Sequence, residues 1–179
     1  MNYATIKYTD IANGIGVRVS LFVSGCRHHC RGCFNPETWD FCYGKPFTDE
    51  VMEDIMNACA PDYIEGLSLL GGDPFEPKNI PTVLRVAKEF KKRYPNKTIW
   101  CYTGYDFDKD VMAGKLADKE TTAELLSCID ILVDGEFHLE EKNLKLRFRG
   151  SSNQRVINVP ETLKNYANDN KIVLWDEKD

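Results

Sequence analysis

The sequence predicts an α/β fold, a partial, open (β/α) barrel, on three observations. Strand-like and helix-like segments alternate along the chain, which implies parallel strands joined by right-handed crossovers. A turn of glycine and polar residues follows most of the predicted strands. The chain has 179 residues, whereas eight strand–helix units need about 250, so it can form only part of a closed barrel. We expect a single domain over residues 1–179, with a less regular part from about residue 139.

The first predicted strand covers residues 17–23, where β-branched and apolar side chains lead into Ser24-Gly25-Cys26. A helix should begin after Thr48, because threonine is a good N-cap and two acidic residues follow it. The apolar positions of this helix recur at helical spacing, at Val51, Met52, Ile55, Met56 and Cys59.

The second predicted strand, residues 67–70, ends at Gly71-Gly72-Asp73-Pro74. Pro81 then opens a helix that ends near Tyr94, because proline suits the first turn of a helix. Its buried positions should be Val83, Leu84, Ala87 and Phe90.

The third and fourth predicted strands, residues 98–102 and 129–133, flank a helix at residues 122–127. Beyond residue 139 we expect strands at residues 155–159 and 171–174. Loops that leave the carboxyl ends of parallel strands meet on one rim, where α/β proteins place their chemistry. The cysteine loop and the segments at residues 71–74, 102–105 and 134–137 should therefore converge on one site.

The composition limits the classes of partner. A formal net charge of −5 without a stripe of lysine or arginine disfavours direct binding of nucleic acid. No apolar run approaches the roughly 18 residues of a membrane span, and residues 1–7 lack the features of a secretory signal. We therefore expect a cytoplasmic protein with neither a membrane nor a nucleic-acid partner.

Seven cysteines are present, and three of them form the pattern Cys26-x-x-x-Cys30-x-x-Cys33. An odd number of cysteines, with three close together, suits a metal centre better than a disulfide framework. Three thiolates on one short loop can hold a [4Fe–4S] cluster and leave its fourth iron open to a substrate, as catalytic metal sites do. The pattern therefore predicts a catalytic cluster.

Two alternatives compete with that interpretation. One is a zinc-binding interaction domain with His28, His29 or Cys42 as fourth ligand, although most zinc sites use two separated ligand pairs. The other is an electron-transfer ferredoxin, which normally has a fourth cysteine ligand. We expect the two histidines to be exposed. Three of the four remaining cysteines should be small core residues, namely Cys59, Cys101 and Cys128.

The cysteine pattern, followed by Gly71-Gly72-Asp73-Pro74 after a second strand, resembles the radical S-adenosylmethionine superfamily. More narrowly, the chain resembles the family that activates anaerobic ribonucleoside-triphosphate reductases, over residues 10–156. The segment at residues 149–155 favours this family over activases of the pyruvate formate-lyase type. The narrower likeness lies in Trp100-Cys101-Tyr102-Thr103-Gly104-Tyr105, Val133-Asp134-Gly135 and Arg149-Gly150-Ser151-Ser152-Asn153-Gln154-Arg155.

The resemblance implies a barrel of the radical-SAM type and an iron–sulfur enzyme with two cofactors, a [4Fe–4S] cluster and S-adenosylmethionine. Reductive cleavage of S-adenosylmethionine would yield methionine and a 5′-deoxyadenosyl radical. That radical would generate a glycyl radical on the large subunit of anaerobic ribonucleoside-triphosphate reductase. The resemblance also implies a reduced flavodoxin or similar electron donor, and it allows a homodimer.

The resemblance assigns the metal to Cys26, Cys30 and Cys33, with no catalytic side chain beyond the two cofactors. Many members of the superfamily have an aromatic residue before the third cysteine that helps to hold adenine. Here that position is Gly32, so Phe34 or the backbone of residues 32–34 would take its place. The implied cofactor-binding set is Gly32, Cys33, Phe34, Asn35, Gly71, Gly72, Asp73 and Asp134.

Several of these residues also have ordinary structural explanations. Gly71-Gly72-Asp73-Pro74 would in isolation be a strand-ending turn, and Asn35 and Asp134 are common turn residues. Side chains alternate along a strand, so of Tyr102 and Thr103 one should point away from the pocket. Three arginines either form surface charge or contact the partner or the S-adenosylmethionine carboxylate, namely Arg147, Arg149 and Arg155.

Overall fold

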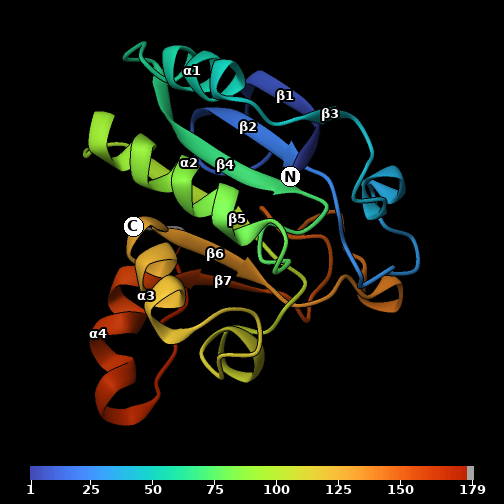
Figure 1. Cartoon of the computed structure of the whole chain (residues 1–179). Coiled ribbons are helices and arrows are strands. Elements are labelled where there is room, and N and C mark those ends of the chain that lie inside the picture. Colours follow the sequence, from blue (N-terminus) through green and yellow to red (C-terminus); the bar gives the residue numbers. More distant parts are fainter. Residues whose placement is uncertain (177–179) are drawn as a thin grey trace.

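One mixed sheet organises the computed structural model, which describes residues 1–176 (Figure 1). The last three residues of the predicted domain lie outside the described residues. Seven described strands follow the order β3-β1-β2-β4-β5-β6-β7 across the sheet. They are β1 (Asn2–Asp10), β2 (Val17–Val23), β3 (Lys45–Pro46), β4 (Ile64–Gly71), β5 (Thr98–Tyr102), β6 (Ile131–Asp134) and β7 (Arg155–Asn158).

The four central strands, β2, β4, β5 and β6, run parallel to one another, which confirms the pairing predicted from strand–helix alternation. At the margins, β1 pairs antiparallel with both β2 and β3, and β7 pairs antiparallel with β6. The architecture is therefore mixed α/β, and the partial, open barrel stays a prediction. Because the central strands are parallel, the loops that leave their carboxyl ends meet at one edge of the sheet.

The α-helices pack on one face of the sheet, where their buried side chains and those of the strands form the main hydrophobic core. Short helical turns lie in the loops: η1 (Pro36–Trp39), the π-helical η2 (Phe107–Val111) and η3 (Leu139–Glu141). Among the described residues, no helix combines the length and the apolar character needed to cross a bilayer. The α-helices are α1 (Asp49–Ala58), α2 (Ile80–Arg93), α3 (Lys119–Cys128) and α4 (Val159–Asp169).

The helix boundaries and core cysteines follow the sequence signals closely. Thr48 caps α1, because its hydroxyl accepts a hydrogen bond from the Val51 amide at 3.4 Å. The second helix ends with Tyr94 as its C-cap, as predicted. The prediction of buried cysteines is also confirmed, at Cys59, Cys101 and Cys128.

The carboxyl-terminal part differs from the prediction. Residues 171–174 do not form a strand, because only a single isolated bridge joins Leu174 to Ile157. Val159 does not end a strand but begins α4, since the Asn158 side chain caps the amide of Glu161 at 3.1 Å. The sequence also did not predict β1, which contains few apolar residues. These elements flank the central strands and do not change their order.

The two faces of the sheet have different neighbours. In β5, Ile99 and Cys101 belong to the main core, whereas Trp100 lies in a second apolar cluster, which Tyr102 packs against. This division follows from the alternation of side chains along a strand. On the second face, the Trp100 ring contacts Phe148 with centroids 4.8 Å apart. The helix-free face is therefore covered by loops, and the pocket described below lies on it.

A buried arginine ties the amino-terminal ends of three central strands together. Arg18 in β2 is 1% exposed. Its guanidinium donates to the hydroxyl of Ser68 at 2.8 Å and to the carbonyl oxygens of Leu67 and Thr98 at 3.0 and 2.7 Å. Burial lowers the pKa of this guanidinium to about 10, which leaves it charged at neutral pH. Neutral oxygens from β4 and β5 thus solvate a buried cation.

The substitution Arg18→Met should lower the free energy of unfolding by about 2–4 kcal/mol, because buried carbonyl oxygens of β4 and β5 lose their donor. Urea unfolding followed by circular dichroism measures this loss. Arg85→Met is the matched control, since Arg85 is half exposed and pairs with an exposed Asp49. The control should change the same free energy by less than about 0.5 kcal/mol. Equal losses in both variants would contradict the role given to Arg18.

Candidate metal and cofactor site

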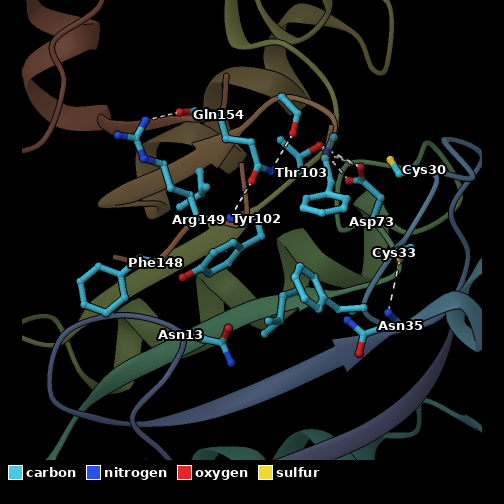
Figure 2. Close-up of a pocket in the computed structure, with 18 of the residues that line it drawn as sticks. Asn13, Cys30, Cys33, Asn35, Asp73, Tyr102, Thr103, Phe148, Arg149 and Gln154 are labelled. Atoms are coloured by element: carbon cyan, nitrogen blue, oxygen red, sulfur yellow. Dashed lines mark hydrogen bonds between the residues drawn. The ribbon is translucent and has the colours of Figure 1, made fainter. Parts of the chain in front are cut away.

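A pocket of about 600 Å³ opens at the carboxyl ends of the central parallel strands (Figure 2). The loops after β2, β4, β5 and β6 all contribute to its wall, which confirms the convergence predicted from the sequence. Figure 2 shows Cys30 and Cys33 at one end of the pocket and Phe148 and Arg149 at the other. Concave sites of this size take small-molecule ligands and cofactors.

The cysteine loop, residues 24–35, follows directly from β2. The Cys33 amide donates to the Cys30 carbonyl oxygen at 3.1 Å and closes a turn between these two cysteines. Left-handed backbone bends the loop back over the sheet, so that all three cysteines line the same pocket. The residues with positive φ are Gly25, His29 and Gly32.

The thiols differ in exposure. Cys26 is buried, whereas Cys30 and Cys33 are partly exposed. Burial raises the pKa of Cys26 to about 12 and also raises the pKa of Cys30. A bound metal replaces such thiol protons. The Asn35 amide lies 3.4 Å from the Cys33 sulfur and donates to it, a type of hydrogen bond that tunes iron–sulfur centres.

The donor set fits an iron–sulfur cluster. Three free cysteines line one wall, and thiolates are the usual ligands of such clusters. Within residues 1–176, no group of three or more histidine, cysteine or acidic side chains is placed to hold a single metal ion. In a cluster each thiolate binds a different iron, so the sulfur atoms need not converge on one point. The three cysteines line one pocket without converging on a single point, and this arrangement suits a cluster.

The strip formed by Gly71, Gly72 and Asp73 packs directly against the cysteine loop. The Gly72 amide donates to Val23 at 2.7 Å, and the Asp73 amide donates to Gly25 at 2.8 Å. A Cβ atom on Gly72 would lie 2.6 Å from the Gly25 carbonyl oxygen, closer than real Cβ atoms come. Only glycine fits there. The strip therefore sets the position of the cysteine loop above the sheet.

Asn79 reinforces this contact, although no sequence signal had identified it as a site residue. Its side-chain amide donates to the carbonyl oxygens of Ser24 at 3.1 Å and Asp73 at 2.9 Å. Asn79 is also the N-cap position of α2 and is 1% exposed. The amide thus joins the cysteine loop, the glycine strip and the start of α2.

The Asp73 carboxylate connects three of the loops at this edge. It is 1% exposed and accepts hydrogen bonds from the Thr103 hydroxyl and the Gly104 amide, both at 2.8 Å. It also lies 3.2 Å from Nε2 of His28, as an ion pair rather than a well-directed hydrogen bond. These hydrogen bonds orient the segment that contains Asp73.

The prediction of exposed histidines is wrong for His28 and is confirmed for His29, which is exposed. His28 is largely buried between Asp73 and Glu136, with its Nδ1 atom 2.6 Å from the Glu136 carboxylate. Burial alone would lower the pKa of His28, but the two carboxylates outweigh burial and raise the pKa to about 9. The ring is therefore cationic at neutral pH. His29 stacks on Trp39 with ring centroids 4.7 Å apart.

Most of the predicted cofactor-binding residues line the pocket. Phe34 is 60% exposed. Its ring packs against Phe137 with centroids 5.2 Å apart, and the Lys142 ammonium lies over the ring at 5.1 Å from its centroid. Both Tyr102 and Thr103 line the pocket, although we expected only one. Gly32 is not part of the wall. The predicted residues that line it are Cys26, Cys30, Cys33, Phe34, Asn35, Gly71, Gly72 and Asp73.

Asp134 is not brought into the pocket. Its buried carboxylate accepts a hydrogen bond from the Phe107 amide at 2.7 Å and forms an ion pair with Arg155. Arg155 also pairs with Asp108 at 2.7 Å, so it is neither free surface charge nor a ligand for a carboxylate in the pocket. This geometry gives Asp134 a structural role between β6 and η2 and offers no support for a cofactor contact.

Much of the remaining wall comes from the segment at residues 135–154, where the sequence signal was weak. Gln154 holds this segment, because its Oε1 atom accepts from Gly150 at 2.8 Å and its Nε2 atom donates to Gly135 at 2.9 Å. The Arg149 guanidinium donates to the Gln154 carbonyl oxygen. Phe137 also lines the pocket and belongs to the segment at residues 134–137 that was predicted to converge on the site. The other lining side chains, Leu144, Leu146 and Phe148, were not predicted, because isolated apolar residues in a polar stretch give no clear signal.

Comparison with known proteins agrees with this site. A family model described as a 4Fe-4S single cluster domain matches residues 12–157. The "anaerobic ribonucleoside-triphosphate reductase-activating protein" of Pasteurella multocida is 40% identical over 156 residues, which cover 86% of this chain and 95% of that protein.

Proteins of the same name from Escherichia coli strain K12 and Enterobacteria phage T4 are each 40% identical over 158 residues. These matches cover 87% of this chain and 97% and 93% of the two relatives. The chain therefore belongs to the family of anaerobic ribonucleoside-triphosphate reductase-activating proteins, with a 4Fe-4S single cluster domain.

Proposed function

We propose that this protein activates an anaerobic ribonucleoside-triphosphate reductase by generating a glycyl radical on its large subunit. One observation carries the proposal: the three cysteines and the Gly71–Asp73 strip share one pocket in a chain of the activating family. When bound there, a reduced [4Fe–4S] cluster supplies the electron that cleaves S-adenosylmethionine to methionine and a 5′-deoxyadenosyl radical, which takes a hydrogen atom from the glycine.

The residues of the pocket bind and orient the reactants. Cys26, Cys30 and Cys33 hold three irons and leave the fourth iron without a protein ligand. Gly71 and Gly72 line the pocket, so their backbone carbonyl oxygens can meet the methionine ammonium of S-adenosylmethionine.

Away from the cysteines, apolar side chains exclude water, which protects a reactive radical from side reactions. The exposed ring of Phe34 offers a surface for adenine. These residues of the chain thus account for binding, orientation and shielding.

The proposal includes the partners and the setting. Cys30 and Cys33 are partly exposed, so a reduced flavodoxin or similar donor can approach the cluster end of the pocket. The seven cysteines are all free thiols, which fits a reducing, cytoplasmic setting. We also propose that the protein forms a homodimer and that its fold is a partial, open barrel of the radical-SAM type. An incomplete barrel leaves the pocket accessible to a macromolecule.

The substitution Cys30→Ala should abolish S-adenosylmethionine cleavage, because two thiolates cannot hold the cluster with one open iron. The test is anaerobic reconstitution with iron and sulfide, followed by measurement of bound iron, visible charge-transfer absorption and 5′-deoxyadenosine after reduction. A glycyl doublet in the reductase, seen by electron paramagnetic resonance, measures the complete reaction.

Cys42→Ala is the matched control for that experiment, since Cys42 is exposed and lies outside the pocket wall. It should keep the iron content and the cleavage activity of the unsubstituted protein. Full activity in Cys30→Ala, or its loss in Cys42→Ala, would show that the ligand set is wrong.

The substitution Gly72→Ala should lower 5′-deoxyadenosine formation by about tenfold to a hundredfold, because the new Cβ atom forces the cysteine loop away from the glycine strip and misplaces the reacting groups. The assay is cleavage of S-adenosylmethionine by the reconstituted protein under reducing conditions.

Gly114→Ala serves as the comparison. Its backbone has positive φ, which that of Gly72 does not, but a Cβ atom there would meet nothing closer than 3.9 Å. Gly114 lies outside the pocket wall, so this variant should cleave S-adenosylmethionine within twofold of the parent rate. A Gly72→Ala protein as active as Gly114→Ala would refute the close-contact argument.

A further inference from the structure

Tyr102 carries a hydroxyl that the proposed chemistry does not yet use. The residue ends β5 and lines the pocket. Its hydroxyl oxygen is buried and has no hydrogen-bond partner within residues 1–176. In Figure 2 the hydroxyl points toward Phe148 and away from Cys30 and Cys33. A buried polar atom without a protein partner is unfavourable, so its presence in a pocket wall indicates a contact made with a ligand.

Asn13 offers the complementary group at the same end of the pocket. Its Nδ2 atom donates to Oδ2 of Asp10 at 2.6 Å. A carboxylate can only accept, so this contact fixes the orientation of the amide and leaves its oxygen as the group available to a ligand. That oxygen accepts no hydrogen bond from the described residues. Figure 2 shows it directed toward the pocket region below Tyr102.

The hydroxyl of Tyr102 can act as a donor at neutral pH. Burial raises the pKa of Tyr102 above its ordinary value, and the charge of the nearby Arg18 only partly offsets this effect. The phenol therefore keeps its proton. The pocket thus presents one donor and one acceptor at the end remote from the cysteines.

Apolar side chains surround this pair and restrict what can bind there. A ligand that enters this region must bring polar groups that match the pair and few bulky substituents. A peptide main chain meets both conditions at a glycine, because each backbone amide has one N–H and one C=O that need partners when buried. The apolar surroundings are Phe22, Leu70, Val133, Leu146 and Phe148.

We propose that the Tyr102 hydroxyl and the Asn13 side-chain oxygen bind the peptide main chain of the reductase beside the glycine that becomes the radical. Tyr102 donates to a backbone carbonyl oxygen, and Asn13 accepts from a backbone N–H. Tyr102 is a positioning residue that holds the glycine Cα–H bond in line for hydrogen abstraction. The inference rests on the proposed function and adds the recognition of its protein substrate.

The test compares Tyr102→Phe with the unsubstituted, reconstituted protein. Without the reductase, 5′-deoxyadenosine formation should stay within twofold, since the hydroxyl lies away from the cluster end. With the purified large subunit of the reductase, the glycyl radical formed per 5′-deoxyadenosine should fall about tenfold to a hundredfold, the range expected when a buried carbonyl loses its donor. The melting temperature of Tyr102→Phe should be unchanged or higher, because the removed hydroxyl had no partner.

Tyr63→Phe is the matched control. Tyr63 is 63% exposed and is not part of the pocket wall, so this variant should match the parent in cleavage, radical yield and melting temperature. A merely structural role of Tyr102 would lower stability and cleavage together and would leave the ratio of radical to 5′-deoxyadenosine constant. That result would overturn the proposal.

Two further results would also overturn it. An unchanged radical yield in Tyr102→Phe would show that the hydroxyl makes no contact with the reductase. A loss of cleavage without the reductase would assign the hydroxyl to S-adenosylmethionine instead. If the unsubstituted protein cleaves S-adenosylmethionine but forms no glycyl radical, the proposed function itself fails and this inference fails with it, and the parent measurement alone reveals that case.

Discussion

The backbone contact between the cysteine loop and the Gly71–Asp73 strip is the constraint on which the site depends. Two short hydrogen bonds, from Gly72 to Val23 and from Asp73 to Gly25, join the loops that leave adjacent parallel strands. Because no side chain fits at Gly72, the two loops approach as closely as their backbones allow. The ligands of the metal and the backbone groups that face its substrate are therefore placed by one interface, and neither can shift without the other.

Charge at this interface is paired rather than exposed to the pocket. The buried Asp73 carboxylate receives hydrogen bonds from Thr103 and Gly104 and lies against a cationic His28, which Glu136 holds from the other side. Paired and hydrogen-bonded groups of this kind resist reorganisation, because separating them would leave a charge buried without compensation. The electrostatic surroundings of the cysteines are thus fixed by the loops that follow four strands, β2, β4, β5 and β6, before any ligand binds.

The sequence predicted the parallel strands and the cysteine pocket because those features depend on local signals. The apolar run of β2 predicts a buried strand, and the glycines at the end of β4 predict a turn, without reference to any distant residue. His28, Asn79 and Gln154 could not be assigned in the same way, because each depends on a partner between 19 and 108 residues distant, namely Glu136, Ser24 and Gly135. The strand predicted at residues 171–174 was wrong for a related reason: apolar residues there pack beside α4 and meet β7 at one bridge only.

The division of the sheet into two faces explains why binding of the cofactors and binding of a protein substrate can be separated. Residues that alternate toward the helices, such as Ile99 and Cys101, build the core and are closed to ligands. Their neighbours Trp100 and Tyr102 face the loops, where the segment at residues 135–154 has little regular structure. The cysteines lie on the loop that follows β2, while the opposite end combines strand residues such as Tyr102 with loop residues such as Phe148. Because loops tolerate sequence change better than strands do, recognition of the partner can vary in this family while the chemistry is retained.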